Sequence, residues 1–173
     1  AQVNCLAGQL HTLGVGKGDR VAIMLPNCPQ AVIAYYATLS LGAIAVLTNP
    51  LYVERELEHQ WGEAGVETVF VLDLLWPRIE ALRRKLPLKR IILTGVQDYL
   101  PFPKNLLFPF QARREGNWVD VPFGDGIFSF KRLVRGQAAA LPPMSLSPDD
   151  LACLQYTGGT TGLPKGAMLT HRN

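Results

Sequence analysis

Short apolar segments alternate with helical segments along this chain about every 22 to 25 residues, and this rhythm limits its fold more than any other feature. Almost wholly apolar runs, as strands buried on both faces require, occupy residues 20–25, 43–47, 67–72 and 89–93. Segments with helical spacing of apolar residues lie at 3–13, 30–41, 54–64 and 75–86. We therefore expect a doubly wound α/β fold, in which helices cover both faces of a mainly parallel sheet.

Composition supports a folded domain and narrows the classes of ligand. Hydrophobic residues make up 48% of the 173 residues and charged residues 18%, which suits a chain with a proper core. The net charge of +3 is too mild to indicate nucleic-acid binding. No GxGxxG sequence follows the first predicted strand, so a dinucleotide site is not indicated.

The cysteines and histidines do not form a metal-binding pattern. Cys5, Cys28 and Cys153 are far apart, and no CxxC pair or Cys/His cluster exists, so we predict free thiols and no metal site. The three histidines are isolated in the sequence, which favours surface or capping roles over catalysis. They are His11, His59 and His171.

The rhythm breaks after residue 96. We expect an irregular excursion over residues 97–126 with a short helix near 105–114, then a short helix over 127–135. A linker over 136–148 and a final strand at 151–156 follow, and residues 1–173 together form one α/β subdomain. The stretch 99–110 is apolar with basic residues nearby. Two interpretations stay open for it: packing against another part of the protein, or contact with a membrane surface.

A glycine- and threonine-rich motif directly follows the last predicted strand. Glycines let backbone N–H groups approach an anion closely, threonine hydroxyls add donors, and a lysine supplies a positive charge for phosphate. The candidate phosphate-binding residues are Thr157, Gly158, Gly159, Thr160, Thr161, Gly162 and Lys165. The spacing is not that of a Walker A loop. The alternative is a plain glycine turn between two strands.

Residues 156–166, which we call the candidate phosphate loop, resemble the AMP-binding signature of the superfamily of acyl-CoA synthetases, peptide synthetases and luciferases. Gly158 stands where serine is commonest, and this variant is typical of bacterial long-chain fatty acid–CoA ligases. Segments 16–27, 49–58 and 100–107 are similar to the same subgroup. Val53 departs from the subgroup's usual threonine, which affects a helix cap.

The resemblance implies a two-step reaction. A fatty carboxylate attacks the α-phosphate of Mg²⁺–ATP to give acyl-AMP and pyrophosphate, and the thiol of CoA then takes the acyl group. The resemblance implies that the candidate phosphate loop holds the β- and γ-phosphates, with Thr160 and Thr161 in direct side-chain contact. Tyr156 is expected to pack below the loop. No catalytic residue and no metal ligand are expected within these residues.

The resemblance also implies that this chain is an N-terminal fragment of a larger enzyme. Because the sequence shows no long apolar run and no signal peptide, we expect a cytoplasmic location, with peripheral contact at the inner face of the membrane as the alternative. The adenine and ribose contacts, the acid that meets Mg²⁺, the hinge and the C-terminal lysine would follow Asn173, so we expect the fragment to be inactive alone. Its partners would be ATP, fatty acid, CoA and the rest of the parent chain, and not nucleic acid. Two alternatives remain: a ligase for an aryl or medium-chain acid, and a non-catalytic nucleotide- or lipid-binding module.

Overall fold

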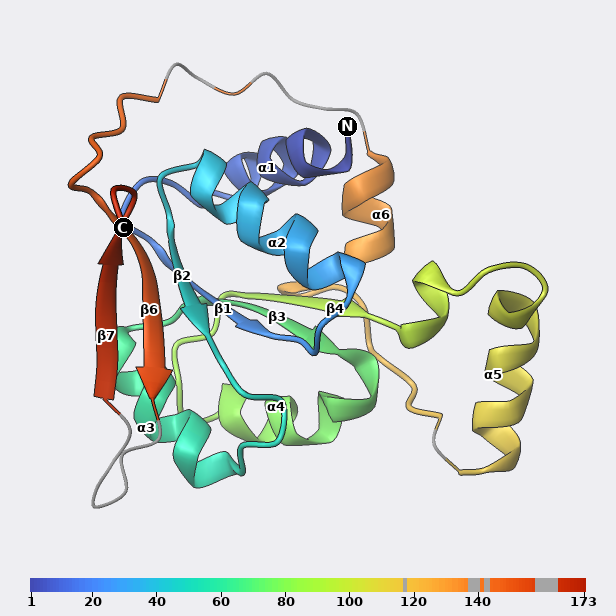
Figure 1. Ribbon diagram of the computed structural model, residues 1–173. Helices are drawn as coiled ribbons and strands as arrows, with labels where there is room; N and C mark the ends of the chain where they lie inside the picture. The colour runs from blue at the N-terminus through green and yellow to red at the C-terminus, as the bar shows by residue number, and fades with distance from the viewer. Residues whose placement is uncertain (117, 137–140, 142–143, 158–164) are drawn as a thin grey trace.

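The computed structural model describes residues 1–116, 118–136, 141, 144–157 and 165–173 (Figure 1). Its centre is a seven-stranded sheet in the order β5-β4-β3-β1-β2-β6-β7. Strands β1 to β6 pair in parallel, and β7 runs antiparallel to β6. The strands are β1 (Arg20–Met24), β2 (Ile44–Leu47), β3 (Thr68–Leu72), β4 (Arg90–Thr94), β5 (Ile127–Ser129), β6 (Leu151–Thr157) and β7 (Lys165–Thr170).

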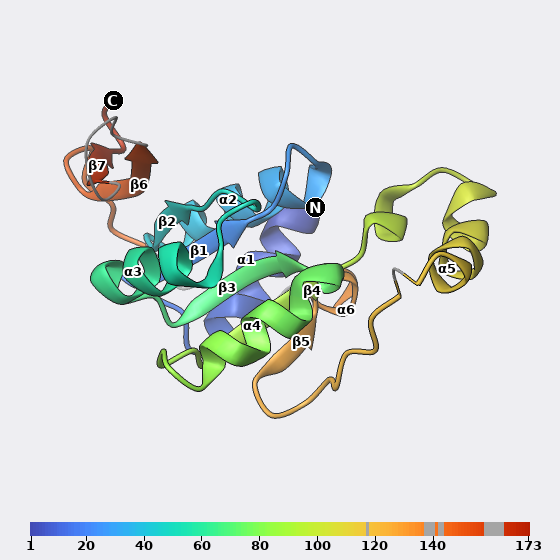
Figure 2. The ribbon, with the colours of Figure 1, turned by 90° about the horizontal axis from the view of Figure 1, so that it is seen from below.

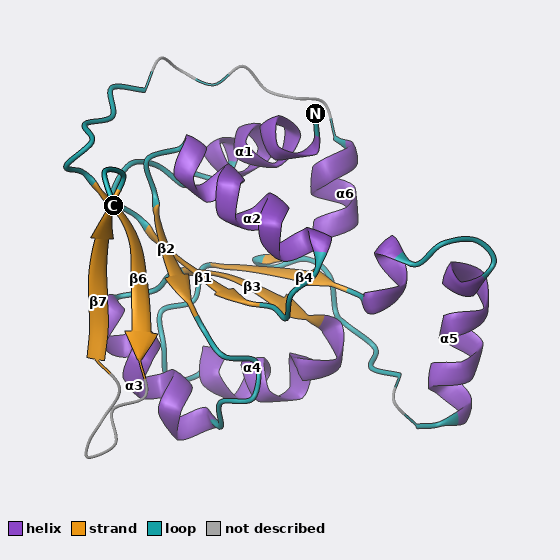
Figure 3. Ribbon diagram, viewed as in Figure 1, coloured by secondary structure: helices purple, strands orange, loops and turns teal. Residues whose placement is uncertain are grey.

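Helices cover both faces of the sheet, which confirms the predicted doubly wound α/β class (Figures 1 and 3). One face carries α1, α2 and α6, and the other carries α3 and α4. Helix α5 stands outside both layers, as the view from below in Figure 2 also shows. The helices are α1 (Gln2–Thr12), α2 (Pro29–Ser40), α3 (Glu54–Ala64), α4 (Trp76–Arg83), α5 (Lys104–Arg114) and α6 (Phe130–Arg135), with 3-10 turns η1 (Asp73–Leu75) and η2 (Val96–Tyr99).

Successive residues of each central strand enter opposite cores, because side chains alternate across a strand. In β1, Val21 and Ile23 pack against the helices α1, α2 and α6, whereas Ala22 and Met24 pack against α3 and α4. Residues of β3 alternate in the same way. Both faces of these strands are buried, which explains why their sequences are continuously apolar rather than alternating with polar residues.

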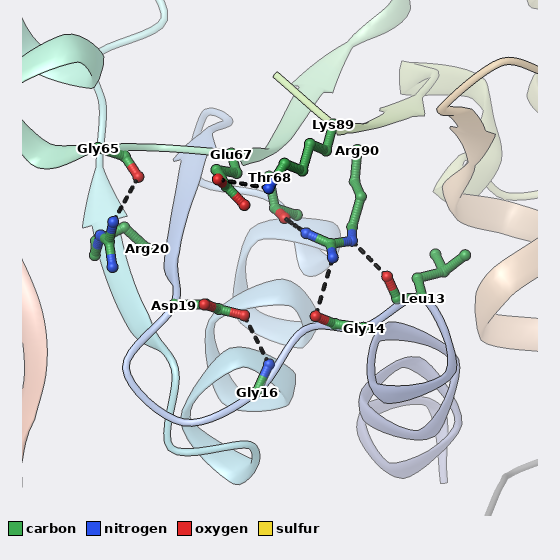
Figure 4. A network of polar contacts seen from close by, with 10 residues as sticks. All are labelled: Leu13, Gly14, Gly16, Asp19, Arg20, Gly65, Glu67, Thr68, Lys89 and Arg90. Atoms are coloured by element: carbon green, nitrogen blue, oxygen red, sulfur yellow. Dashed lines mark hydrogen bonds and ion pairs between the residues drawn. The ribbon is translucent and has the colours of Figure 1, made fainter. Parts of the chain in front are cut away.

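Two arginines bind helix ends at the amino-terminal edge of the sheet (Figure 4). Arg90 donates from Nε to the carbonyl oxygen of Leu13 (2.6 Å) and from Nη2 to that of Gly14 (2.9 Å), just beyond α1. Arg20 donates to the carbonyl oxygens of Ala64 and Gly65 at the end of α3. Helix C-termini leave carbonyl groups without partners, so these guanidinium groups satisfy acceptors that would otherwise need water.

The structure differs from the sequence interpretation in two places after residue 126. Residues 127–135 are not a single helix, because strand β5 precedes α6 and pairs in parallel with β4, with Ile127 opposite Ile91. Three residues are too few for periodicity to distinguish a strand from a helix. The sequence interpretation also assigned no element to residues 167–173, which mostly belong to β7. The helix expected near 105–114 is present as α5.

Candidate functional site

A groove of about 780 Å³ opens at the carboxyl ends of β1, β2 and β6. Its walls come from the segments that leave these strands and from the outward side of α2. The lining residues used below are Asn27, Tyr35, Tyr36, Asn49, Gln155 and Tyr156. The chain leaves β1 toward the face of α2 and leaves β2 toward the face of α3, so the groove lies where the connections diverge. Open α/β sheets bind ligands at such a point.

The candidate phosphate loop begins at the end of β6 and finishes at the start of β7, and its first residue, Tyr156, lines the groove. Thr157 ends β6 and lies opposite Lys165, the first residue of β7, in the antiparallel register. The side chain of Lys165 is exposed. The predicted residues Gly158, Gly159, Thr160, Thr161 and Gly162 lie outside the described residues. The structure therefore brings together the two ends of the predicted motif, and the phosphate contacts of the motif remain a prediction.

Tyr156 packs into the core beneath the first residue of the motif. Its ring belongs to the core between the sheet and α3, and its hydroxyl donates to a carboxylate oxygen of Glu63 at 3.3 Å. Burial and the negative charge of Glu63 raise the pKa of Tyr156 to about 12. The phenol is therefore neutral at physiological pH, and it acts as a hydrogen-bond donor that fixes the end of β6 to α3.

The structure explains why a glycine, Gly166, follows the lysine of the motif. It lies opposite Tyr156 in the register of β6 and β7. A Cβ atom at this position would lie 3.0 Å from the Tyr156 ring, which is tighter than most contacts between packed carbon atoms, so the ring would have to shift. The aromatic ring of β6 and the glycine of β7 are thus a matched pair, and the pair sets how closely the two strands approach beside Lys165.

Several groove residues were not singled out from the sequence. Tyr35 and Tyr36 of α2 stack edge to face with ring centroids 5.5 Å apart, and Tyr36 is exposed. Asn27 and Asn49 come shortly after β1 and β2. The carboxyl ends of parallel strands meet at one edge of a sheet, where ligands bind. The position of each asparagine shortly after a predicted strand could therefore have marked it as a candidate ligand-binding residue. The tyrosines carried no such signal, because an apolar helix does not reveal which side faces a groove.

A second hollow, of about 450 Å³, lies beneath α5 near η1 and η2. Its lining includes the apolar Phe108 and Trp118 and the carboxyl group of Asp73. Burial raises the pKa of Asp73, although hydrogen bonds from Gln97 and Leu74 oppose this shift. The β6–β7 hairpin is on the opposite side of the molecule (Figure 1). An acidic, largely apolar hollow suits a phosphate poorly, so the groove is the stronger candidate for a nucleotide.

The described part of the chain has neither a candidate metal site nor a candidate membrane span. Within it, no group of three or more His, Cys, Asp or Glu side chains is arranged to hold a metal ion. No helix in that part has the length and apolar character needed to cross a bilayer. Of the cysteines, Cys153 is buried, and burial raises the pKa of its thiol.

Comparisons of sequence and of structure find similar proteins among known enzymes. The model of the family described as "AMP-binding enzyme" matches residues 1–173. A long-chain-fatty-acid–CoA ligase of Bacillus subtilis is 46% identical over 170 residues, which cover 97% of this chain and 30% of that protein. A ligase of the same name from Escherichia coli O157:H7 is 41% identical, over 93% of this chain and 29% of that protein.

Solved structures of two CoA ligases are similar to this chain over almost its whole length. The anthranilate CoA ligase AuaEII in complex with anthranoyl-AMP superposes with a TM-score of 0.78 at 26% identity, over 99% of this chain and 28% of that one. A long-chain-fatty-acid-CoA ligase from Archaeoglobus fulgidus superposes with a TM-score of 0.74 at 27% identity, over 98% and 28%. The chain thus spans less than a third of the length of these relatives.

Proposed function

Because this chain belongs to the AMP-binding enzyme family, we propose that its full-length parent is a fatty acid–CoA ligase that uses long-chain acids. The parent would join a fatty carboxylate to the α-phosphate of ATP, release pyrophosphate, and transfer the acyl group to CoA. One observation carries this proposal. In this family member, Thr157 and Lys165, the first and last residues of the predicted motif, pair at the ends of two strands, and the adjacent Tyr156 lines the groove.

Within this reaction, the proposed task of the chain is to hold the phosphates. Backbone N–H groups and hydroxyls of residues 157–162 would bind the β- and γ-phosphates, and Lys165 would offset their negative charge. Such groups accelerate phosphoryl and adenylyl transfer by positioning and by electrostatic stabilisation. The buried Tyr156 would support the scaffold, because its hydroxyl donates to Glu63 of α3.

Mg²⁺ and CoA belong to the proposed reaction of the parent. When bound, Mg²⁺ would neutralise phosphate charge, and we assign none of its ligands to the described residues, which contain no cluster of three or more potential ligands. The remaining parts of the site would come from the rest of the parent. We accordingly propose that the 173-residue chain alone does not catalyse the reaction.

An aryl-acid ligase is the second candidate. The anthranilate CoA ligase shares the fold, and a rice 4-coumarate–CoA ligase is 34% identical over 96% of this chain. The higher identity of 46% to a long-chain-fatty-acid–CoA ligase favours the fatty acid. A non-catalytic nucleotide- or lipid-binding module is less well supported, because the relatives compared above carry the names of enzymes.

Exchange of labelled pyrophosphate into ATP tests the acid class. The full-length parent is supplied with palmitate, octanoate, 4-coumarate or anthranilate in parallel, and the isolated chain is supplied with palmitate. We expect exchange by the parent to be fastest with palmitate, and none by the isolated chain. Faster exchange with an aryl acid would show that the parent prefers aryl acids to fatty acids, and it would leave the proposed adenylation reaction unchanged. Absence of exchange with every acid would contradict the proposal.

A further inference from the structure

The hollow beneath α5 adjoins a second hollow of about 270 Å³, which lies at the carboxyl ends of β4 and β5. Four residues line both hollows: Asp73, Gln97, Trp118 and Val119. We call the two hollows together the α5 recess, with a larger and a smaller compartment. None of the described residues that line it also lines the groove at β1, β2 and β6, so the proposed reaction gives the recess no task. Ligands bind at this edge of an open α/β sheet.

The charges that line the α5 recess are all negative. Its carboxylates are those of Asp73, Asp98, Glu115 and Asp120, and the described residues that line it include no lysine, arginine or histidine. Lys131, which lies outside the recess, pairs with Asp98 at 3.4 Å. Neither Asp73 nor Asp120 has an ion-pair partner in the described part of the chain. The recess therefore repels anions and favours a cation.

Asp73 is the carboxylate that both compartments share. It follows directly after β3, and it accepts hydrogen bonds from Nε2 of Gln97 at 3.2 Å and from the backbone N–H of Leu74 at 2.8 Å. Burial raises the pKa of its carboxyl group, and the negative charge of Asp98 adds to this rise, although the two hydrogen bonds oppose it. A positive group bound in the recess would offset the cost of keeping this carboxylate ionised.

Aromatic rings also line the recess. Trp118 lines both compartments, Phe108 the larger one and Phe123 the smaller one. The indole N–H of Trp118 donates to the carboxylate of Asp120 at 2.9 Å, which holds this ring beside a negative charge. Arg113, which does not line the recess, has its guanidinium 4.6 Å from the centroid of the same ring, so the ring already contacts one cation. Aromatic rings beside carboxylates are the surroundings that bind an alkylammonium group.

We propose that the α5 recess binds an aliphatic diamine or polyamine. Besides the shared Asp73, each compartment has carboxylates of its own, Glu115 in the larger and Asp98 and Asp120 in the smaller. A ligand with an ammonium group at each end pairs with a carboxylate in each compartment, and its methylene groups pack on the shared ring of Trp118. A metal ion fits less well, because the described residues contain no group of three or more His, Cys, Asp or Glu side chains arranged to hold one.

Isothermal titration calorimetry of the full-length parent with putrescine tests this inference. The measurement needs no ATP, fatty acid or CoA, so its outcome does not depend on the proposed reaction. The matched control ligand is the diol in which hydroxyl groups replace the two ammonium groups of putrescine. We expect saturable binding of putrescine, no measurable binding of the diol, and no displacement of putrescine by Mg²⁺ at an equal concentration, because the recess selects for charge and for an aliphatic body together.

Two substitutions in the recess should weaken the binding of putrescine. Asp73→Asn should raise the Kd at least about tenfold, because the shared charge is lost while the asparagine oxygen can still accept from the N–H of Leu74. Trp118→Leu should raise the Kd about fivefold, because the aromatic face is lost. Asp149→Asn is the matched control, since Asp149 is an exposed carboxylate that precedes β6 and pairs with Arg172 at 2.9 Å. It should bind putrescine as the wild type does.

Circular dichroism should show the wild-type spectrum for all three variants, because none of the replaced side chains belongs to the buried core. Failure of the wild-type parent to bind putrescine would overturn the proposal. So would wild-type affinity in a folded Asp73→Asn or Trp118→Leu protein, or binding of the diol as tightly as putrescine. Displacement of putrescine by an equal concentration of Mg²⁺ would also overturn it, because the recess would then be only an acidic surface.

Discussion

Tyr156 shows how one side chain connects the candidate phosphate loop to the core. The sequence placed it immediately before the motif, and the resemblance implied that it packs below the loop. The structure adds two contacts that the sequence could not supply: the hydrogen bond to Glu63 of α3, and the close fit against Gly166 of β7. Both partners are distant in sequence or belong to a strand that was not predicted, so no local pattern pointed to them.

Replacement of this tyrosine should reveal its hydrogen bond. Tyr156→Phe keeps the ring against Gly166 and removes the donor to Glu63, so the free energy of unfolding at pH 7 should fall by about 1 kcal/mol. Because Glu63 is half exposed, its carboxylate regains water in the variant, which keeps the loss small. Urea titration of wild-type and variant protein measures the difference, and a loss of several kcal/mol would contradict this account.

The same substitution should alter the stability of the protein in alkali. The pKa of Tyr156 is raised to about 12 in the folded state, from about 10 in the unfolded state, so the folded state holds this proton more tightly. Its contribution to stability is complete below pH 10 and is lost as the pH rises toward 12. Thermal melts across this window should show a steeper decline for the wild-type protein than for Tyr156→Phe. Equal slopes would show that the phenol does not titrate as described.

At the scale of elements, most of the helices and strands could be predicted because their signals are local. Glu54–Ala64 was placed from its apolar spacing, and Gly65 ends the helix with φ +67°. The expected weakness at its start is also visible. The N–H of Val53 donates to Glu56 at 2.8 Å, but valine has no oxygen to return the bond, so the reciprocal half of a capping box is missing. Strands β5 and β7 were missed because their pairing partners, not their sequences, make them strands.

The arginine at the start of β4 offers a test of how elements are joined. Arg90 binds two carbonyl groups beyond α1 and the hydroxyl of Thr68 on β3. Arg90→Leu should reduce the free energy of unfolding by about 2 kcal/mol, because the charged hydrogen bonds to the carbonyl oxygens of Leu13 and Gly14 are lost. Arg90→Lys should restore less than half of this, since an ammonium group cannot reproduce the fork of a guanidinium. Full rescue by lysine in urea titrations would argue for a charge effect alone.

At the scale of the whole molecule, the class of the fold was predictable and the order of its strands was not. Continuous apolar runs joined by helices indicate a parallel sheet covered on both faces, which is confirmed. That β6 pairs with β2, across a separation of about a hundred residues, follows from three-dimensional packing that periodicity does not encode. The groove arises from this pairing, so its position could be anticipated only as the carboxyl end of the sheet.

The most direct test of the central claim is pyrophosphate exchange with palmitate by the full-length parent and its Lys165→Ala variant. If residues 157–162 and Lys165 hold the phosphates of ATP, the variant should lose about a hundredfold in exchange rate and stay folded, because one charged stabilising group is removed. Lys89→Ala is the matched control, since Lys89 is an exposed lysine paired with Glu67 at the other end of the sheet. Its exchange rate should equal that of the wild-type parent. Undiminished exchange by Lys165→Ala would contradict the assignment of this loop to the phosphates.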